Sequence, residues 1–378
     1  MTTCKRFLVL LVCCALLLPG CQAAPPIRIG FVAELSGRNA VLGVQGRNGA
    51  QLAVDEINAR GGVAGRQLEL MVRDDLGKTD ELLNADRKLI DSQVVALTGH
   101  MTSWEAIAAI DLIQDQGVPL FSATTSTPAL TGKRDLFFRL IPTNQSQSHP
   151  LAEFLYHQLN LRRAAVIFES DNAAFTETYA NGFSQSFGKL GGKISIQTSY
   201  STSDNPNFAQ IVNDLRSAGP ADVLLIVASS IETALLAQQV RLQDWPVQLA
   251  TSNWAYTDDL LRNGGRAVER ILITSQFNSD CQAPDFLAFK SSYEAKFGEK
   301  PAFVAVFSYE TILVLARALE TTGGLRQGLA DALLKTGPIA GLCDQIVMDE
   351  FGDAQRSLYL MTVRSGFYEV ITSYLPNP

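Results

Sequence analysis

Residues 27–33 read IRIGFVA, residues 35–37 read LSG, and a helical pattern follows over residues 43–60. The first segment is rich in β-branched and aromatic residues, as is typical of a buried strand. In the helical segment, apolar residues recur at the i, i+3, i+4, i+7 spacing of a helix that packs one face on a sheet. These are Ala50, Ala53, Val54 and Ile57. The pattern predicts a strand and then a helix, the first unit of an α/β domain.

Strand-like and helical segments alternate along the rest of the chain in two series. The first runs over residues 27–141 and the second over 164–275. Such alternation predicts parallel sheets covered by helices on both faces. No low-complexity linker separates the two series, so we expect two closely hinged α/β lobes. Near the end, residues 349–353 predict a turn that joins strands at 345–348 and 357–363 in a hairpin.

The first twenty residues have the pattern of a secretory leader. Lys5 and Arg6 precede an apolar core of twelve residues, which is too short to cross a bilayer. The leader ends in Leu18-Pro19-Gly20-Cys21, which resembles the processing site of bacterial lipoproteins. We expect a signal peptide at 1–20, lipidation of Cys21 and a linker at 21–26. The alternative is an ordinary secretory signal with a chance cysteine.

The charge of the chain argues against some classes of partner. Removing Lys5 and Arg6 with the leader changes the formal charge from −7 to −9. Nucleic acids and anionic membrane surfaces attract basic patches, so neither is expected as a partner. After the leader, no stretch is long and apolar enough for a transmembrane helix.

Motifs for catalysis are absent from the sequence. It contains no phosphate-binding loop, no dinucleotide-binding Gly-x-Gly-x-x-Gly after a strand, and no Cys-x-x-Cys or His-x-x-x-His metal pattern. His100 lies three residues before Ser103, which suggests a nucleophile and base, but no Gly-x-Ser-x-Gly turn surrounds the serine. We therefore expect no enzyme, no cofactor and no metal.

Two strand ends are rich in hydroxyl groups. In residues 99–105, Thr102 and Glu105 fit a capping box. In residues 121–131, Thr127 and Pro128 fit a helix start. Ligands of open α/β sheets bind beyond such strand ends, where helix N-termini suit a carboxylate. Capping explains less well why four hydroxyl residues crowd into one turn: Ser122, Thr124, Thr125 and Ser126.

Two cysteines follow Cys21, namely Cys281 and Cys343. An even pair outside the cytoplasm can form a disulfide. Two buried free thiols are the alternative.

The order and spacing of several short segments resemble those of type I periplasmic binding proteins of the leucine/isoleucine/valine-binding kind. The similarity covers nearly the whole mature chain. The segments include Leu35-Ser36-Gly37, Ala53-Val54-Asp55-Glu56-Ile57-Asn58-Ala59-Arg60, Gly61-Gly62, Asp74-Asp75, Pro128-Ala129-Leu130-Thr131, Phe138-Arg139 and Gly352-Asp353.

The resemblance implies a fold and a division of the chain. Two Rossmann-like lobes, joined by three hinge crossings near Pro142, Gln276 and Gly337, would close on a small solute. Lobe 1 would comprise 27–142 and 277–337, and lobe 2 would comprise 143–276 and 338–378.

The resemblance also implies roles for residues of lobe 1. Ser103 would hydrogen-bond the ligand carboxylate, with Ser126 helping. Thr124 falls where a backbone carbonyl receives the ligand ammonium, and Thr125 lies in the same turn. Leu42 would shape the pocket.

Lobe 2 departs from the family pattern. Phe175 and Thr176 replace the usual Tyr-Gly, and no aromatic residue lies near Ser229. Asn253 falls where a carboxylate is expected to pair with the ligand ammonium. A buried ammonium without a charged partner is costly. Lobe 1 therefore predicts a carboxylate, whereas lobe 2 does not predict an α-amino group.

Two explanations of this departure stay open. In a shifted register, Asp171 or Asp258 would supply the missing acid. Alternatively, Trp254, Tyr256 and Phe175 would form an apolar wall, or they would simply be packing residues.

The resemblance implies an extracytoplasmic solute-binding subunit of an ABC importer, a monomer in the periplasm or at the cell surface. It would bind an amino acid or a related small carboxylate by hinge closure, work with a permease and be held at the membrane by its lipid. The alternatives are a ligand-sensing subunit for a receptor or kinase and a binder of non-amino organic or aromatic acids.

Overall fold

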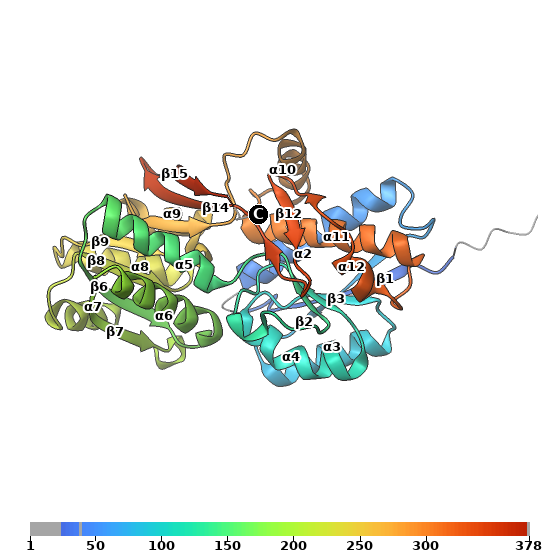
Figure 1. The fold of residues 1–378 in the computed structure, drawn as a ribbon, viewed down its shortest axis with the longest axis horizontal. Helices are drawn as coiled ribbons and strands as arrows, with labels where there is room; N and C mark the ends of the chain where they lie inside the picture. Colours follow the sequence, from blue (N-terminus) through green and yellow to red (C-terminus); the bar gives the residue numbers. More distant parts are fainter. Residues whose placement is uncertain (1–23, 38–39, 376–378) are drawn as a thin grey trace, which may run out of the picture.

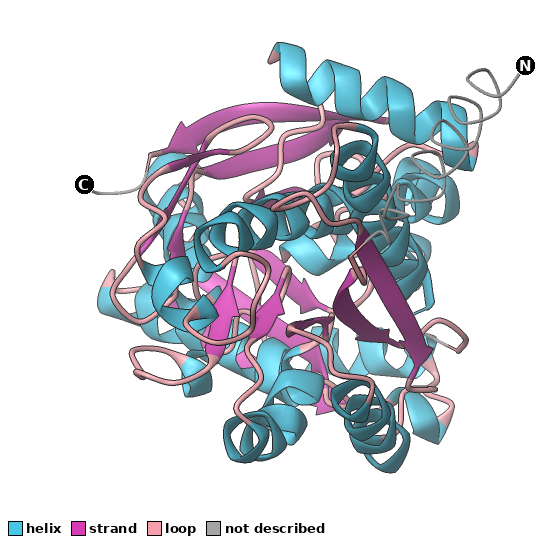
Figure 2. Ribbon diagram, turned by 90° about the vertical axis from the view of Figure 1, so that its right-hand side faces the viewer, coloured by secondary structure: helices cyan, strands magenta, loops and turns pink. Residues whose placement is uncertain are grey.

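The computed structural model describes residues 24–37 and 40–375. The expected leader, Cys21 and the first part of the linker lie outside the described residues. Two lobes stand side by side, with lobe 1 on the right of Figure 1 and lobe 2 on the left. Each lobe has its own sheet. In the view of Figure 2, helices surround the strands on both sides.

Lobe 1 contains a five-stranded parallel sheet in the order β2-β1-β3-β4-β5. Its strands are β1 (Ile27–Ala33), β2 (Leu68–Asp74), β3 (Ala96–Gly99), β4 (Leu120–Ser122) and β5 (Phe137–Arg139). Its helices are α2 (Ala40–Ala59), α3 (Thr79–Asp91), α4 (Ser103–Gln116), α10 (Pro284–Phe297), α11 (Phe303–Thr322) and α12 (Leu329–Leu334). A short helical turn, η1 (Pro128–Leu130), follows β4.

The apolar pattern of the sequence explains the layers of lobe 1. Six of the seven residues of β1 are buried, because helices cover both faces of the sheet. Residues of α3 and α4 form one apolar cluster with the sheet, and residues of α2 and α11 belong to another. Helices α2 and α11 approach closely at Gly49, where an added Cβ would lie 2.0 Å from the carbonyl oxygen of Ala305.

Lobe 2 contains a seven-stranded sheet in the order β15-β14-β10-β9-β8-β6-β7. Its strands are β6 (Arg163–Glu169), β7 (Lys193–Tyr200), β8 (Val223–Val227), β9 (Gln248–Thr251), β10 (Leu272–Ser275), β14 (Leu358–Arg364) and β15 (Phe367–Tyr374). Its helices are α5 (Asn144–Glu153), α6 (Ala173–Lys189), α7 (Phe208–Ser217), α8 (Ser230–Leu242) and α9 (Asp258–Gly264). Short turns are η2 (Phe154–Gln158), η3 (Thr202–Asp204), η4 (Asn253–Ala255) and η5 (Gly265–Val268). The first five strands pair in parallel, whereas β14 and β15 pair antiparallel.

A third, small sheet lies on lobe 1. It consists of β11 (Ile339–Ala340), β12 (Gln345–Met348) and β13 (Ala354–Gln355). The turn at residues 349–353 is where the sequence places it, but the predicted hairpin partner is wrong. Strand β12 pairs with β13, and residues 358–363 belong to β14 instead.

Buried ion pairs hold this small sheet against lobe 1. The guanidinium of Arg356 is buried and lies 2.5 Å from a carboxylate oxygen of Glu310 in α11. It also pairs with Asp344. Nearby, the Nε of Arg139 lies 2.8 Å from a carboxylate oxygen of Asp353. Residues 339–356 are therefore part of lobe 1.

The third crossing between the lobes follows from these contacts. It lies between Arg356 and Leu358, where the chain enters β14, and not near Gly337. The expected assignment of residues 338–357 to lobe 2 is corrected accordingly. The other two crossings join β5 to α5 and β10 to α10. Among the residues that the structure describes, no helix is long and apolar enough to span a bilayer.

A disulfide joins Cys281 to Cys343, with 6.2 Å between their Cα atoms. Cys281 lies on the segment that leads from β10 to α10, which is the second crossing. Cys343 lies between β11 and β12. The bond therefore ties the second crossing to the small sheet that precedes the third.

We predict no reactive thiol in the denatured, unreduced protein that starts at Gln22. The double variant Cys281→Ser/Cys343→Ser should be less stable by about 2–4 kcal/mol, because the bond restricts a long loop of the unfolded chain. Thiol titration and denaturant unfolding measure the two effects. Two titratable thiols in the unmodified protein would contradict the bond.

Candidate functional site

A small cavity lies between the two lobes. Its walls include residues that follow β3, β4, β6 and β9, so it lies beyond the carboxyl ends of strands from both sheets. This is where open α/β sheets bind ligands. The lining residues are Leu42, Met101, Thr102, Ser103, Thr124, Asn172, Phe175, Asn253, Trp254 and Phe303.

The N-terminus of α4 forms one wall of the cavity. Ser103 is the first residue of this helix, and the backbone N–H of Thr102 donates to the Glu105 carboxyl at 2.8 Å. Thr102 is the N-cap residue, and its side chain takes part in a capping box with Glu105. Free helix N–H groups, the positive end of the helix dipole and the hydroxyl of Ser103 together suit an anion.

The hydroxyl-rich turn after β4 is bonded mainly to the loop after β3. The hydroxyl of Thr124 donates to the carbonyl of Met101 at 2.6 Å. Ser122 and Thr125 both donate to the carbonyl of His100 at 3.1 Å. These bonds explain why hydroxyl residues crowd into this turn: they join the two loops that form the lobe 1 wall.

The predicted lobe 1 residues therefore separate into two groups. Leu42, Ser103 and Thr124 line the cavity. Thr125 and Ser126 are fully buried and are not among the lining residues. The hydroxyl of Ser126 has no hydrogen-bond partner there.

On the lobe 2 side, Phe175, Asn253 and Trp254 line the cavity. Ser229 does not, because it caps α8: its hydroxyl accepts from the backbone N–H of Glu232 at 3.4 Å. Tyr256 is buried elsewhere, and its hydroxyl donates to Ser279 at 2.9 Å.

Neither of the two acids considered as ammonium partners lines the cavity. The carboxylate of Asp171 accepts hydrogen bonds from Ser201 and Thr202, and these bonds lower its pKa although partial burial opposes them. Asp258 lines a different hollow. Among the described residues that line the cavity, none carries a charged side chain.

Four lining residues were missed from the sequence: Met101, Thr102, Asn172 and Phe303. Thr102 was assigned to helix capping alone. Asn172 follows β6 closely, so the rule that identified Ser103 would also have found it. Phe303 begins α11, some two hundred residues further along the chain than Ser103, and no local pattern marks it.

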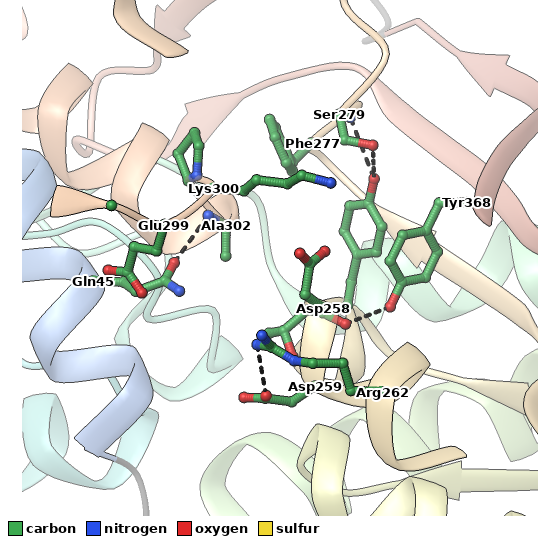
Figure 3. Close-up of a pocket in the computed structure, with 14 residues that line it drawn as sticks. Gln45, Asp258, Asp259, Arg262, Phe277, Ser279, Glu299, Lys300, Ala302 and Tyr368 are labelled. Atoms are coloured by element: carbon green, nitrogen blue, oxygen red, sulfur yellow. Dashed lines mark hydrogen bonds and ion pairs between the residues drawn. The ribbon is translucent and has the colours of Figure 1, made fainter. Parts of the chain in front are cut away.

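Charged side chains line two other hollows of the molecule. One hollow includes Glu34, Glu169, Asp171 and Glu232. In the other, shown in Figure 3, Gln45, Glu299 and Lys300 of lobe 1 face Asp258, Asp259 and Arg262 of lobe 2. Arg262 pairs with Asp259 of its own lobe at 2.9 Å. The cavity is therefore lined by uncharged residues, whereas the two other hollows are lined by charged ones.

A buried ionisable cluster lies behind the N-terminus of α4. Burial raises the pKa of Glu105 to about 8, and the charge of Asp75 adds to this effect. The imidazole of His100 lies 3.1 Å from the Asp86 carboxylate, which raises its pKa although burial opposes it. At neutral pH Glu105 is mostly neutral, so it adds little negative charge near the helix end.

The chain is similar to known proteins over most of its length. A family model described as periplasmic binding protein matches residues 26–367. An amino acid binding protein of Pseudomonas aeruginosa is 26% identical over 350 residues, covering 90% of each chain.

Two solved structures share the fold. A leucine-binding protein of Thermotoga maritima superposes with a TM-score of 0.84 at 24% identity, covering 93% of this chain and 99% of the other. A solute-binding protein of an ABC transporter from Rhodopseudomonas palustris, solved with 3,4-dihydroxybenzoic acid, gives 0.84 at 20% identity, covering 93% and 98%.

The matched family comprises binding proteins and not enzymes, and it acts outside the cytoplasm. Both expectations from the sequence are thereby confirmed, as is the fold of parallel sheets flanked by helices. The chain belongs to the periplasmic binding protein family, in the type I group of the leucine/isoleucine/valine-binding proteins.

Proposed function

We propose that this chain is the solute-binding subunit of an ABC importer and that its solute is an aromatic carboxylic acid without an α-amino group. The observation that carries the proposal is the composition of the cavity wall. Three of its ten lining residues are aromatic and none of the ten is charged. An amino acid would bury its ammonium without a carboxylate partner, and the lost hydration of this charge would weaken binding by several kcal/mol.

The carboxylate of the ligand would bind at the N-terminus of α4. Ser103 and Thr102 offer hydroxyl groups there. The helix contributes its dipole without a compensating negative charge, since Glu105 is largely protonated at neutral pH.

The ring of the ligand would pack against aromatic side chains. Phe175 and Trp254 meet edge to face, with centroids 5.9 Å apart and an interplanar angle of 89°. Phe303 and Leu42 bring apolar surface from lobe 1. An aromatic ring gains from such offset and edge contacts beyond its apolar area.

The relatives offer support for two ligand classes. The Rhodopseudomonas palustris structure holds a dihydroxybenzoic acid, whereas curated relatives are named for amino acids. The asparagine at position 253, where an acid is expected, supports the aromatic acid. The amino acid remains the competing solute that the first experiment tests.

Closure of the two lobes would allow a permease to distinguish the ligand-bound protein from the empty one. A ligand that contacts both lobes stabilises the closed arrangement by its differential affinity. A lipid at Cys21 would keep the protein at the membrane. A sensing subunit would use the same closure; permease and ATPase genes beside the gene for this chain would point to import.

We predict that benzoate and its derivatives raise the melting temperature of the protein that starts at Gln22, whereas leucine, isoleucine and valine do not. A ligand at a hundred times its Kd adds about 2.7 kcal/mol to stability. A thermal-shift panel that pairs each amino acid with its keto acid measures this. Stabilisation by amino acids but not by their keto acids would reject the proposal.

We predict that Ser103→Ala weakens carboxylate binding by about tenfold or more, because it removes a hydrogen bond to a charged group. Ser126→Ala is the matched control. It removes a buried hydroxyl behind the wall and should leave the Kd unchanged. Calorimetric titration measures both, and equal affinities for the two variants would exclude Ser103 from the site.

We predict that carboxylate affinity falls by roughly tenfold from pH 7 to pH 9, because Glu105 ionises near the ligand anion. Its raised pKa also means that the neutral form stabilises the fold, and this contribution is lost as pH rises through about 8. In the Glu105→Gln variant, the losses of affinity and of stability that come from ionisation of Glu105 should both be absent. An unchanged pH profile of affinity in this variant would contradict the role of Glu105.

A further inference from the structure

Two asparagine side chains in the cavity wall have unsatisfied oxygen atoms. Asn172 is 6% exposed and Asn253 is 5% exposed. The Oδ1 atom of each is buried and accepts no hydrogen bond from the described residues. Both residues line the cavity. A buried amide without a partner is unfavourable, so each of these groups calls for one.

Local structure does not explain Asn172. It occupies the N-cap position of α6, where an asparagine side chain normally accepts from a backbone N–H of the first turn. Here the side chain makes no such bond. Asn207, at the start of α7, does cap its helix in the usual way by accepting from Gln210 at 3.1 Å. Asn172 therefore makes no capping bond, and it lines the cavity and the adjoining acidic hollow.

The two asparagines converge from different elements. Phe175 follows Asn172 by one helical turn, and Trp254 directly follows Asn253. These two rings are in edge-to-face contact at 5.9 Å. Each asparagine is therefore close in sequence to one ring of the aromatic wall, and all four residues line the cavity. The unsatisfied oxygens belong to lobe 2, opposite the Thr102 and Ser103 hydroxyls of lobe 1.

A hydroxyl group fits this pair of amides best. An amide offers an acceptor and donors, and a hydroxyl both donates and accepts, so the two match in either orientation of the amide. A carboxylate lacks the proton that an Oδ1 acceptor needs. An ammonium would lack a counter-charge. A bare ring would leave both amides without partners after displacing their water.

We infer that the Asn172 and Asn253 amides bind a ring hydroxyl at the end of the ligand opposite its carboxylate, and so select hydroxylated aromatic acids over unsubstituted ones. This inference rests on the proposed function. It adds the feature of the ligand that lobe 2 recognises. Lobe 1 would hold the acid and lobe 2 the hydroxyl, so that one rigid ligand connects the two lobes.

The test compares 4-hydroxybenzoate with benzoate and 4-methylbenzoate by calorimetric titration of the protein that starts at Gln22. The methyl group has a similar size to the hydroxyl but cannot donate. We expect 4-hydroxybenzoate to bind at least tenfold more tightly than either analogue, since a site built for a hydroxyl rejects ligands that lack it. Equal affinities for 4-hydroxybenzoate and 4-methylbenzoate would overturn the inference.

Variants identify which residues make the distinction. Asn253→Leu and Asn172→Leu should each reduce the preference for 4-hydroxybenzoate over 4-methylbenzoate by about tenfold. Asn181→Leu is the control on α6, where the side chain is exposed and accepts from Gln197 instead. It should keep the wild-type ratio. Because the ratio is taken within each variant, a general loss of folding lowers both affinities and leaves it unchanged.

The outcomes separate this inference from the proposed function. If all three benzoates bind equally, the aromatic-acid function stands and the hydroxyl site is wrong. If 4-hydroxybenzoate is preferred but both Leu variants keep the full preference, the assignment to these amides is wrong. If none of the three binds and an amino acid does, both proposals fail.

Discussion

The guanidinium of Arg356 is buried between the carboxylates of Glu310 and Asp344, and the position of the hinge depends on this contact. Breaking one partner of such a buried cluster leaves an uncompensated charge in the interior, which is strongly destabilising. The cluster holds residues 339–356 on α11, and Arg139 with Asp353 fixes the other end of the small sheet. The chain is thereby free to cross to lobe 2 after Arg356 and nowhere earlier in this segment.

The same contact shows where sequence reasoning reaches its limit. Alternating strands and helices could be predicted because their apolar periodicity is local. The third crossing could not, because Glu310 and Arg356 are 46 residues apart and no periodic pattern links them. The strand pairing in the small sheet could not be predicted for a similar reason. Residues 357–363 read as a strand, but which strand they pair with is set by lobe 2 and not by the nearby turn.

Some residues of the candidate site could likewise be predicted from the sequence, and others could not. Ser103 and Thr124 could be found from the sequence because they follow strands, where ligands of this architecture bind. Hydroxyl content alone could not tell Thr124, which lines the cavity, from Thr125, which bonds to His100 behind it. Ser229 resembled a site residue because capping and binding use the same residue types at helix starts. The sequence could not show that no charged residue lines the cavity, because this depends on the three-dimensional position of the acidic residues. In the structure, acidic residues line an adjoining hollow instead.

The interleaving of the lobes has a consequence for how the chain is made. Lobe 1 needs α11 and the small sheet, and lobe 2 needs β14 and β15, so both are completed by the last fifth of the sequence. A polypeptide made from its N-terminal end can finish neither lobe until that last part has been made. The Cys281–Cys343 bond likewise needs Cys343 from that last part, so it too forms late.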